Sequence, residues 1–355
     1  MKKRILALFL AIVTLFCFSA CDKKTEEDVK GPYPVIIIPG IIGSELMKDD
    51  RRIWLNELDG FDLSVVADFL ALAVKEDGKS DGSIRPVRFC MADYEGGNIG
   101  TFDVYGDLAE TLAAELGDDC VYFFGYDWRL DNRDTAEELA SYINTVLENT
   151  GAEKVNIVAH SMGGFVTSAY LNSHKNDGLV DRVVTCGTPF LGAEGATVTL
   201  ENGTGLLDFS EYTGEFTPLI SGLFRTLPAL YQLMPASGYE KLGLLNEDGT
   251  IKESATAAAK IGYEYNTQIM ANLTEIWKDV DHYNIVGENH DTAGENGTES
   301  GDGTVTCYSA TANGAFSTGN HKLCLLDLNH NQLVTEYEAV EAILYAVGSE
   351  AYGKR

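Results

Sequence analysis

A serine between small residues follows a strongly apolar run. The segment reads VNIVAHSMGG, with Ser161 between Ala159 and Gly163. A nucleophilic serine in a sharp strand-to-helix turn needs small residues two positions before and two positions after it, because larger side chains would collide there. The segment therefore predicts a nucleophile elbow, in which the hydroxyl of Ser161 attacks an acyl carbonyl carbon.

A serine nucleophile needs a histidine to take its proton and a carboxylate to orient that histidine. In folds with such an elbow, the acid and then the histidine follow the serine, each on a loop after a later strand. Asp302, in GDGTV, and His330, directly after KLCLLDLN, occupy these places, so we predict a triad of Ser161, Asp302 and His330. Asp291 is the alternative acid. His321 is a weaker alternative base, because it precedes the last strand and would fall at the wrong edge of the sheet.

The remaining histidines do not indicate a second catalytic group. We expect His160, next to the serine, to point away from the site and His174 to end a helix. His282 and His290 are interpreted as loop residues. No two histidines have the spacing of zinc ligands, so we expect no metal and no cofactor.

Acyl transfer also needs two N–H groups that bind the negative oxygen formed during attack. The amide of Met162, directly after the nucleophile, is the first candidate. The second is the amide of Ile41 in the glycine-rich turn of IIIPGIIGSEL, where Gly40 lets the chain double back. We predict that these two amides form the oxyanion hole.

The elements that must position these groups alternate along the chain. Short apolar, β-branched runs are separated by helical patterns, which is typical of an α/β fold with a mostly parallel sheet and helices on both faces. With the elbow, this indicates an α/β-hydrolase fold. We predict strands at 34–39, 120–126, 155–160, 180–186, 283–287 and 322–328, and helices at 105–116, 135–148 and 332–347.

One interval breaks this alternation. Residues 194–260 are rich in bulky apolar side chains and lie between two predicted core strands, so we interpret them as an inserted cap or lid. The cap would shelter an acyl chain from water. Residues 289–303 are predicted to form a polar, glycine-rich loop. Candidate walls of the substrate pocket are Trp54, Phe190 and Leu191.

The first 30 residues have the pattern of an export signal. A basic start precedes an apolar run of about 14 residues, shorter than the roughly 20 that a spanning helix needs. The run ends in FSAC, similar to a bacterial lipobox. We expect a signal peptide over 1–20, lipidation of Cys21, a tether over 21–30 and a hydrolase domain over 31–355, anchored to the membrane on its extracytoplasmic side. The alternative is ordinary secretion with cleavage nearby.

Charge and cysteine usage restrict the possible partners. The 355-residue chain has a formal net charge of −28, which argues against nucleic acid because phosphates would be repelled. The five cysteines after Cys21 are widely spaced and suggest neither a zinc site nor a disulfide framework. A single disulfide between Cys307 and Cys324 is an alternative. The sequence does not indicate an oligomeric state.

Seven motifs follow one another along the chain, namely PVIIIPGIIGSEL, IWLNEL, FFGYDWR, AHSMGG, GTPFLG, LPALYQLMP and GDGTV. Taken together, they resemble the lecithin:cholesterol acyltransferase family. The resemblance implies acyl transfer from lipid-like esters to water or an alcohol, the triad and oxyanion donors named above, and an internal ion pair between Asp127 and Arg129. The alternatives are a non-lipid esterase, thioesterase or peptidase on the same scaffold, and an inactive lipid-binding lipoprotein.

Overall fold

The computed structural model describes residues 32–54, 63–206, 217–295 and 297–348. The predicted signal peptide, the tether and Cys21 lie outside the described residues. No helix in the described part of the chain is both long and apolar enough to cross a membrane.

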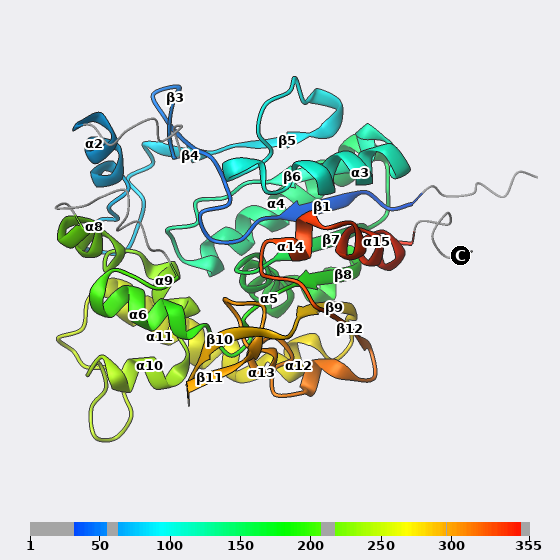
Figure 1. Cartoon of the computed structure of the whole chain (residues 1–355). Coiled ribbons are helices and arrows are strands. Elements are labelled where there is room, and N and C mark those ends of the chain that lie inside the picture. Colours follow the sequence, from blue (N-terminus) through cyan, green and yellow to red (C-terminus); the bar gives the residue numbers. More distant parts are fainter. Residues whose placement is uncertain (1–31, 55–62, 207–216, 296, 349–355) are drawn as a thin grey trace, which may run out of the picture. The chain divides into compact units, whose positions relative to one another are not determined.

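A seven-stranded sheet forms the centre of the domain (Figure 1). Its neighbouring strands are parallel except for the antiparallel pair at one edge, β5 and β6. All six predicted strands are confirmed, and the continuous apolarity of β1 and β6 reflects their burial on both faces. The order across the sheet is β12 (His321–Leu326), β9 (Asp281–Gly287), β8 (Val180–Cys186), β7 (Val155–His160), β1 (Val35–Ile38), β6 (Val121–Phe124) and β5 (Arg88–Cys90).

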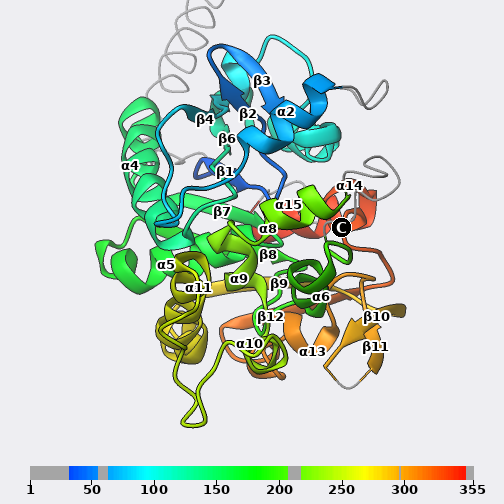
Figure 2. The same ribbon diagram turned by 90° about the vertical axis from the view of Figure 1, so that its left-hand side faces the viewer.

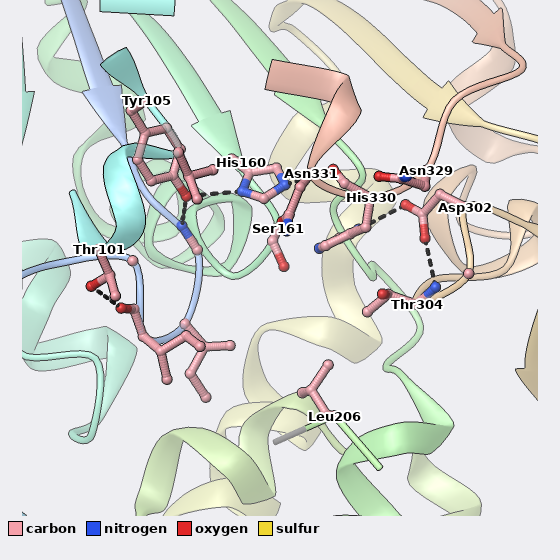
Figure 3. Close-up of a pocket in the computed structure, with 16 residues that line it drawn as sticks. Thr101, Tyr105, His160, Ser161, Leu206, Asp302, Thr304, Asn329, His330 and Asn331 are labelled. Carbon is pink, nitrogen blue, oxygen red and sulfur yellow. Dashed lines mark hydrogen bonds and ion pairs between the residues drawn. The ribbon is translucent and has the colours of Figure 1, made fainter. Parts of the chain in front are cut away.

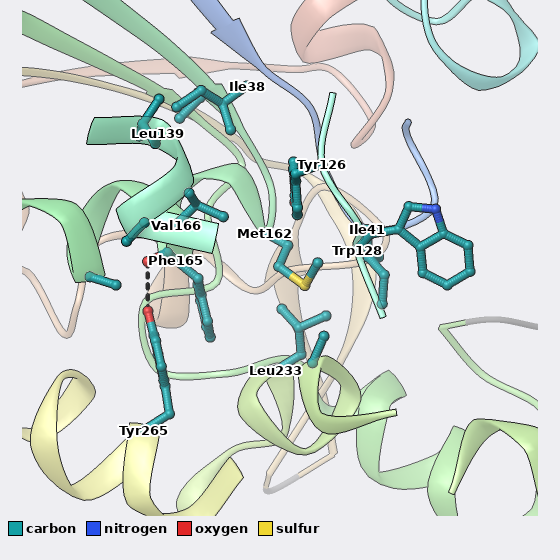
Figure 4. Close-up of a cluster of buried hydrophobic side chains, with 14 of the residues drawn as sticks. Ile38, Ile41, Tyr126, Trp128, Leu139, Met162, Phe165, Val166, Leu233 and Tyr265 are labelled. Atoms are coloured by element: carbon teal, nitrogen blue, oxygen red, sulfur yellow. Dashed lines mark hydrogen bonds between the residues drawn. The ribbon is translucent and has the colours of Figure 1, made fainter. Parts of the chain in front are cut away.

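Helices cover both faces, as the sequence predicts. On β1, Val35 and Ile37 face one hydrophobic core, and Ile36 and Ile38 face another, because successive strand residues point to opposite sides. The first core includes side chains of α3 (Gly106–Leu116), α14 (Gln332–Thr335) and α15 (Tyr337–Ala346). The second includes side chains of α4 (Asn132–Thr150) and α5 (Gly163–His174), and Figure 4 shows part of it.

The prediction of one continuous helix over 332–347 is wrong. Helix α14 ends at Thr335, and Glu336 has an extended backbone with φ −80° and ψ 144° before α15 begins. The break separates two short amphipathic pieces, and each buries its own apolar residues against the sheet. Periodicity did not reveal the break, because one extended residue leaves most of the apolar pattern intact.

The chain between β8 and β9 is helical where the sequence predicts an insertion. Helix α9 packs against both α6 and α11 (Figure 2). The Tyr265 hydroxyl of α11 donates a 2.7 Å hydrogen bond to the carbonyl of Phe165 in α5, which ties these helices to the core. The helices are α6 (Glu194–Asn202), α8 (Thr217–Phe224), α9 (Pro228–Leu233), α10 (Ala236–Lys241), α11 (Ala257–Gln268) and α12 (Leu273–Trp277).

Two small sheets flank the central one. The predicted loop over 289–303 is wrong: it contains an antiparallel hairpin of β10 (His290–Gly294) and β11 (Gly297–Gly301). Backbone pairing does not require apolar side chains, so a polar, glycine-rich sequence did not reveal these strands. The other elements are β2 (Leu46–Lys48), β3 (Arg51–Trp54), β4 (Ile84–Pro86), α2 (Leu63–Ala71), α13 (Cys307–Ala310) and short 3-10 helices at Met91–Asp93, Thr101–Asp103, Asp118–Cys120, Lys175–Asp177, Met270–Asn272 and Ala315–Ser317.

The expected ion pair between Asp127 and Arg129 is confirmed and buried. The Arg129 guanidinium donates to both carboxylate oxygens of Asp127, at 2.7 and 2.6 Å, and to the Leu72 carbonyl at 2.9 Å. Asp127 is 7% and Arg129 2% exposed. Such a pair is expensive to break, because the remaining charge stays buried without its partner.

We therefore expect Arg129→Met to lower the free energy of unfolding by about 3–5 kcal/mol. Lys278→Met is the matched control, since Lys278 pairs with Glu275 at a half-exposed position and should change stability by less than about 1 kcal/mol. Urea unfolding of the two variants and the wild type measures both effects. Equal losses in the two variants would contradict a structural role for the buried pair.

Candidate active site

Ser161 lies in a sharp turn between β7 and α5. Its φ is 52°, in the left-handed region that side chains rarely adopt. A Cβ atom at Gly163 would lie 2.4 Å from the Ile38 carbonyl oxygen, so no larger residue fits there. The strand, turn and helix expected around this serine are therefore present, and Ser161 is held in a strained conformation with its side chain at a cavity.

His330 and Asp302 form a hydrogen-bonded pair. His330 Nδ1 lies 2.7 Å from Asp302 Oδ2, while the other carboxylate oxygen accepts hydrogen bonds from the backbone N–H groups of Thr304 and Val305, at 2.9 and 2.7 Å. Burial alone would raise the pKa of Asp302, but His330 and these two N–H groups outweigh burial and leave the pKa below its ordinary value. The carboxylate is therefore ionised and can orient the imidazole with its proton on Nδ1.

The structure brings all three predicted triad residues to one cavity of about 480 Å³. They come from separate segments: Ser161 follows β7, Asp302 follows β11, and His330 follows β12. Figure 3 shows the His330 ring between Ser161 and Asp302. The described lining consists of Gly40, Ile41, Ile42, Gly43, Thr101, Val104, Tyr105, His160, Ser161, Leu206, Asp302, Gly303, Thr304, Asn329, His330 and Asn331.

The alternative acid and base lie elsewhere. Asp291 is an exposed residue of β10, and His321 begins β12 at the opposite end from His330. Neither lines the cavity of Ser161. The order of elements along the chain therefore predicted which acid and which histidine lie at the cavity of Ser161, because parallel strands end at one edge of the sheet.

The turn after β1 approaches Ser161 closely. A Cβ atom at Gly40 would lie 2.9 Å from the Ser161 Cβ, so only glycine permits this approach. Within the described residues, the amides of Ile41 and Met162 donate no hydrogen bond to the protein, whereas the Gly40 amide donates to the Tyr105 hydroxyl. The two predicted oxyanion donors therefore have no hydrogen-bond acceptor among the described residues, and Ile41 lines the cavity.

The prediction that His160 points away from the site is wrong. Its ring lines the cavity, with Nδ1 2.9 Å from the Tyr105 hydroxyl and Nε2 3.1 Å from the His330 carbonyl oxygen. Strand alternation explains this, because His160 shares the face of Val158, the face covered by α3 and α14. Burial and the neighbouring His330 lower the pKa of His160 to about 3, so its ring is neutral.

Two other histidines also differ from the prediction of loop residues. His282 lies in β9 and is completely buried, with Nε2 2.7 Å from the Thr185 hydroxyl and Nδ1 3.1 Å from Nδ1 of His321. His290 lies in β10. His174 is the last residue of α5, as expected.

The candidate pocket walls are placed away from the cavity of Ser161. The Trp54 indole is buried behind the turn after β1 and donates a 2.8 Å hydrogen bond to the Ile42 carbonyl. Phe190 packs among Trp277, His282 and Phe316 in the core. Leu191 lines a second cavity, formed with α10 and the hairpin of β10 and β11. Trp54 and Phe190 are buried by their bulk and apolarity, Leu191 is half-buried, and other side chains line the cavity of Ser161.

No cysteine is among the described residues that line this cavity. Cys90, Cys120, Cys186, Cys307 and Cys324 are all free, so Cys307 and Cys324 do not form a bridge. Among the described residues, no group of three or more histidine, cysteine, aspartate or glutamate side chains is arranged to hold a metal ion.

Fold and sequence comparisons agree on the class of protein. The structure of the Tle4–Tli4 complex matches over 89% of this chain and 98% of that one, with a TM-score of 0.52 and 15% identity, which supports the fold alone. Together with the sheet order and the strained serine turn, this defines an α/β-hydrolase fold.

The sequence comparison identifies the family. The lecithin:cholesterol acyltransferase family model matches residues 101–298, more than half of the chain, so this protein belongs to that family. Lecithin-cholesterol acyltransferase-like 4 of Arabidopsis thaliana is 25% identical over 57% of this chain and 42% of its own length. Phospholipase A(1) LCAT3 of the same plant is 34% identical over 50% and 46%. The matches thus span less than half of these relatives.

The neutral, buried His160 predicts a specific response to acid. In the unfolded chain it takes up a proton near its ordinary pKa of 6.5, and in the fold only near pH 3. Between these values the unfolded state binds more protons, so acid lowers the free energy of unfolding, by about 1.4 kcal/mol per pH unit from His160 alone. In urea unfolding between about pH 6 and 4, the free energy of unfolding of His160→Gln should change less steeply with pH than that of the wild type, by that amount.

His174→Gln is the control for this measurement. Burial lowers the pKa of His174, but Glu137 and Asp177 outweigh burial and raise the pKa above its ordinary value. Between about pH 6 and 4, His174 is therefore protonated in both the folded and the unfolded state, so it does not contribute to the slope. The slope below the ordinary histidine pKa should be unchanged in that variant. Identical slopes in wild type and His160→Gln would refute a neutral, buried His160.

Proposed function

We propose that this protein is a serine acyl-ester hydrolase or O-acyltransferase that acts on lipid-like esters through an acyl-enzyme on Ser161. The observation that carries this proposal is the strained serine in one cavity with the hydrogen-bonded pair of His330 and Asp302. Family membership supports the same reaction class, as do relatives named as an acyltransferase-like protein and a phospholipase.

The first half of the proposed reaction forms the acyl-enzyme. Because Nδ1 of His330 carries the proton that bonds to Asp302, its Nε2 is free to take the proton of the Ser161 hydroxyl. The serine oxygen attacks the ester carbonyl carbon, and the amides of Ile41 and Met162 bind the resulting oxyanion. The ester carbon–oxygen bond then breaks, and Nε2 returns its proton to the departing alcohol.

The second half transfers the acyl group to an acceptor. Water or an alcohol gives its proton to Nε2 of His330 and attacks the acyl carbon. The bond between the acyl carbon and the Ser161 oxygen then breaks, and Nε2 returns the proton to that oxygen. Asp302 stays ionised and stabilises the imidazolium in both halves, consistent with its lowered pKa. The apolar lining at Ile42, Val104 and Leu206 is suited to the hydrocarbon part of an acyl ester. The helical insertion between β8 and β9 would act as the cap.

Ser161→Ala should lower the release of p-nitrophenol from p-nitrophenyl butyrate by roughly 10³-fold or more, because the nucleophile is lost. It should also abolish covalent labelling by a fluorophosphonate. Ser173→Ala is the matched control, since Ser173 is an exposed serine of α5, the helix that follows Ser161. Turnover of Ser161→Ala equal to that of Ser173→Ala would exclude the proposed acyl-enzyme. Labelling without turnover of any ester in a lipid panel would favour a different acyl substrate.

We also propose that the protein is exported and tethered to a membrane through lipidated Cys21. The support is the basic start, the apolar run and the FSAC segment, which lie outside the described residues. In a bacterium that processes lipoproteins, the full chain should incorporate radiolabelled palmitate and fractionate with membranes. Cys21→Ser should lose both properties, and Cys17→Ser, within the apolar run, should keep them. Unlabelled, soluble wild-type protein would exclude the tether.

A further inference from the structure

Three hydrogen bonds in series connect the turn after β1 to the loop that carries His330 (Figure 3). The Gly40 amide donates to the Tyr105 hydroxyl at 2.8 Å. That hydroxyl lies 2.9 Å from Nδ1 of His160, and Nε2 of the same ring lies 3.1 Å from the His330 carbonyl oxygen. We call this series the Tyr105–His160 link. Both of its side chains are buried, at 2% and 4% exposure.

The two ends of the link determine where its protons lie. The Gly40 amide can only donate, so the Tyr105 oxygen accepts there and gives its own hydrogen to Nδ1 of His160. The His330 carbonyl can only accept, so Nε2 of His160 must carry the proton of the neutral ring. One tautomer therefore satisfies every group in the link. Burial, which lowers the pKa of His160 to about 3, keeps the ring in that neutral form.

The link joins the two parts of the site that must stay in register around Ser161. At one end, Gly40 precedes Ile41, whose amide is the proposed second oxyanion donor. At the other end, the backbone of His330 is held directly, and the His160 ring also packs against the His330 ring with centroids 4.7 Å apart. Because His160 is neutral, it does not repel the positive charge that His330 acquires when it takes a proton.

We propose that Tyr105 and His160 are positioning residues that hold the oxyanion turn and the catalytic imidazole in one geometry for acyl transfer. This inference rests on the proposed function. Neither side chain exchanges a proton with substrate; both act through Ile41 and His330. The role is distinct from that of Asp302, which orients the His330 ring through Nδ1, because the link restrains the His330 backbone and packs against its ring.

Tyr105→Phe tests the link with a minimal change of shape. It removes one hydroxyl, which frees the Gly40 amide and leaves Nδ1 of His160 without its donor. We expect kcat for p-nitrophenyl butyrate to fall by about 10-fold to 100-fold with KM nearly unchanged, since small displacements of catalytic groups slow the reaction without weakening binding. His160→Phe should have a similar effect. The double variant should lose little more than either single variant, because both break the same link.

Tyr239→Phe is the matched control. Its buried hydroxyl donates a 2.7 Å hydrogen bond to the Tyr231 carbonyl and accepts one at 3.3 Å from Asn266 Nδ2, both in the insertion. The variant therefore loses two hydrogen bonds, as Tyr105→Phe does, and kcat should be unchanged. Thermal unfolding of both tyrosine variants separates stability from activity. Equal kcat for Tyr105→Phe and Tyr239→Phe, in a wild type whose turnover needs Ser161, would overturn the positioning role alone. A wild type without Ser161-dependent turnover would overturn the proposed function and the positioning role together.

A second measurement reads the link without turnover. In protein with ¹⁵N-labelled histidine, the nitrogen shifts of His160, assigned by their loss in His160→Gln, report which ring nitrogen carries the proton. We expect the neutral ring with its proton on Nε2 near pH 7 and a change of these shifts in Tyr105→Phe. A proton on Nδ1, or a positively charged ring, would overturn the arrangement on which the positioning role depends.

Discussion

The left-handed backbone of Ser161 is the constraint on which the site depends. A serine does not adopt this conformation unless its surroundings impose it. Here the Ser161 amide donates to the Cys186 carbonyl at 2.9 Å, and the Ser161 carbonyl accepts from the Thr188 hydroxyl at 3.1 Å. Because Gly40 and Gly163 have no Cβ atom, the end of β1 can approach the turn closely. Three neighbouring strands thus hold the serine at the cavity.

The parallel sheet explains why distant residues meet. Strands β7, β9 and β12 run in one direction, so the segments that follow them, and the hairpin after β9, gather at one edge. The loop of His330 is tied there from two sides, by the side chain and backbone of Asp302 and by the ring of His160. A buried, hydrogen-bonded surround of this kind restricts the rotamers of a catalytic imidazole before any substrate arrives.

Two groups of buried polar side chains away from the serine are hydrogen-bonded within the fold. The guanidinium of Arg129 donates hydrogen bonds to Asp127 and to a backbone carbonyl. His282 forms hydrogen bonds with Thr185 and His321 in the core. The family resemblance carried by FFGYDWR implied the first of these groups. The second was misassigned to a loop, because a histidine at the start of a strand carries no pattern of its own.

Local patterns in the sequence determined six of the seven strands of the central sheet, the helices α3, α4 and α5, the serine turn and the placement of Asp302 and His330 after later strands, because apolar periodicity and small residues act over a few positions. Only the tertiary structure decided that His160 faces the cavity, that 289–303 is a hairpin and that Trp54, Phe190 and Leu191 lie outside the cavity of Ser161. The reason is physical. Which face of a strand meets which helix, and which bulky side chain lines a cavity, depends on contacts between segments far apart in the chain.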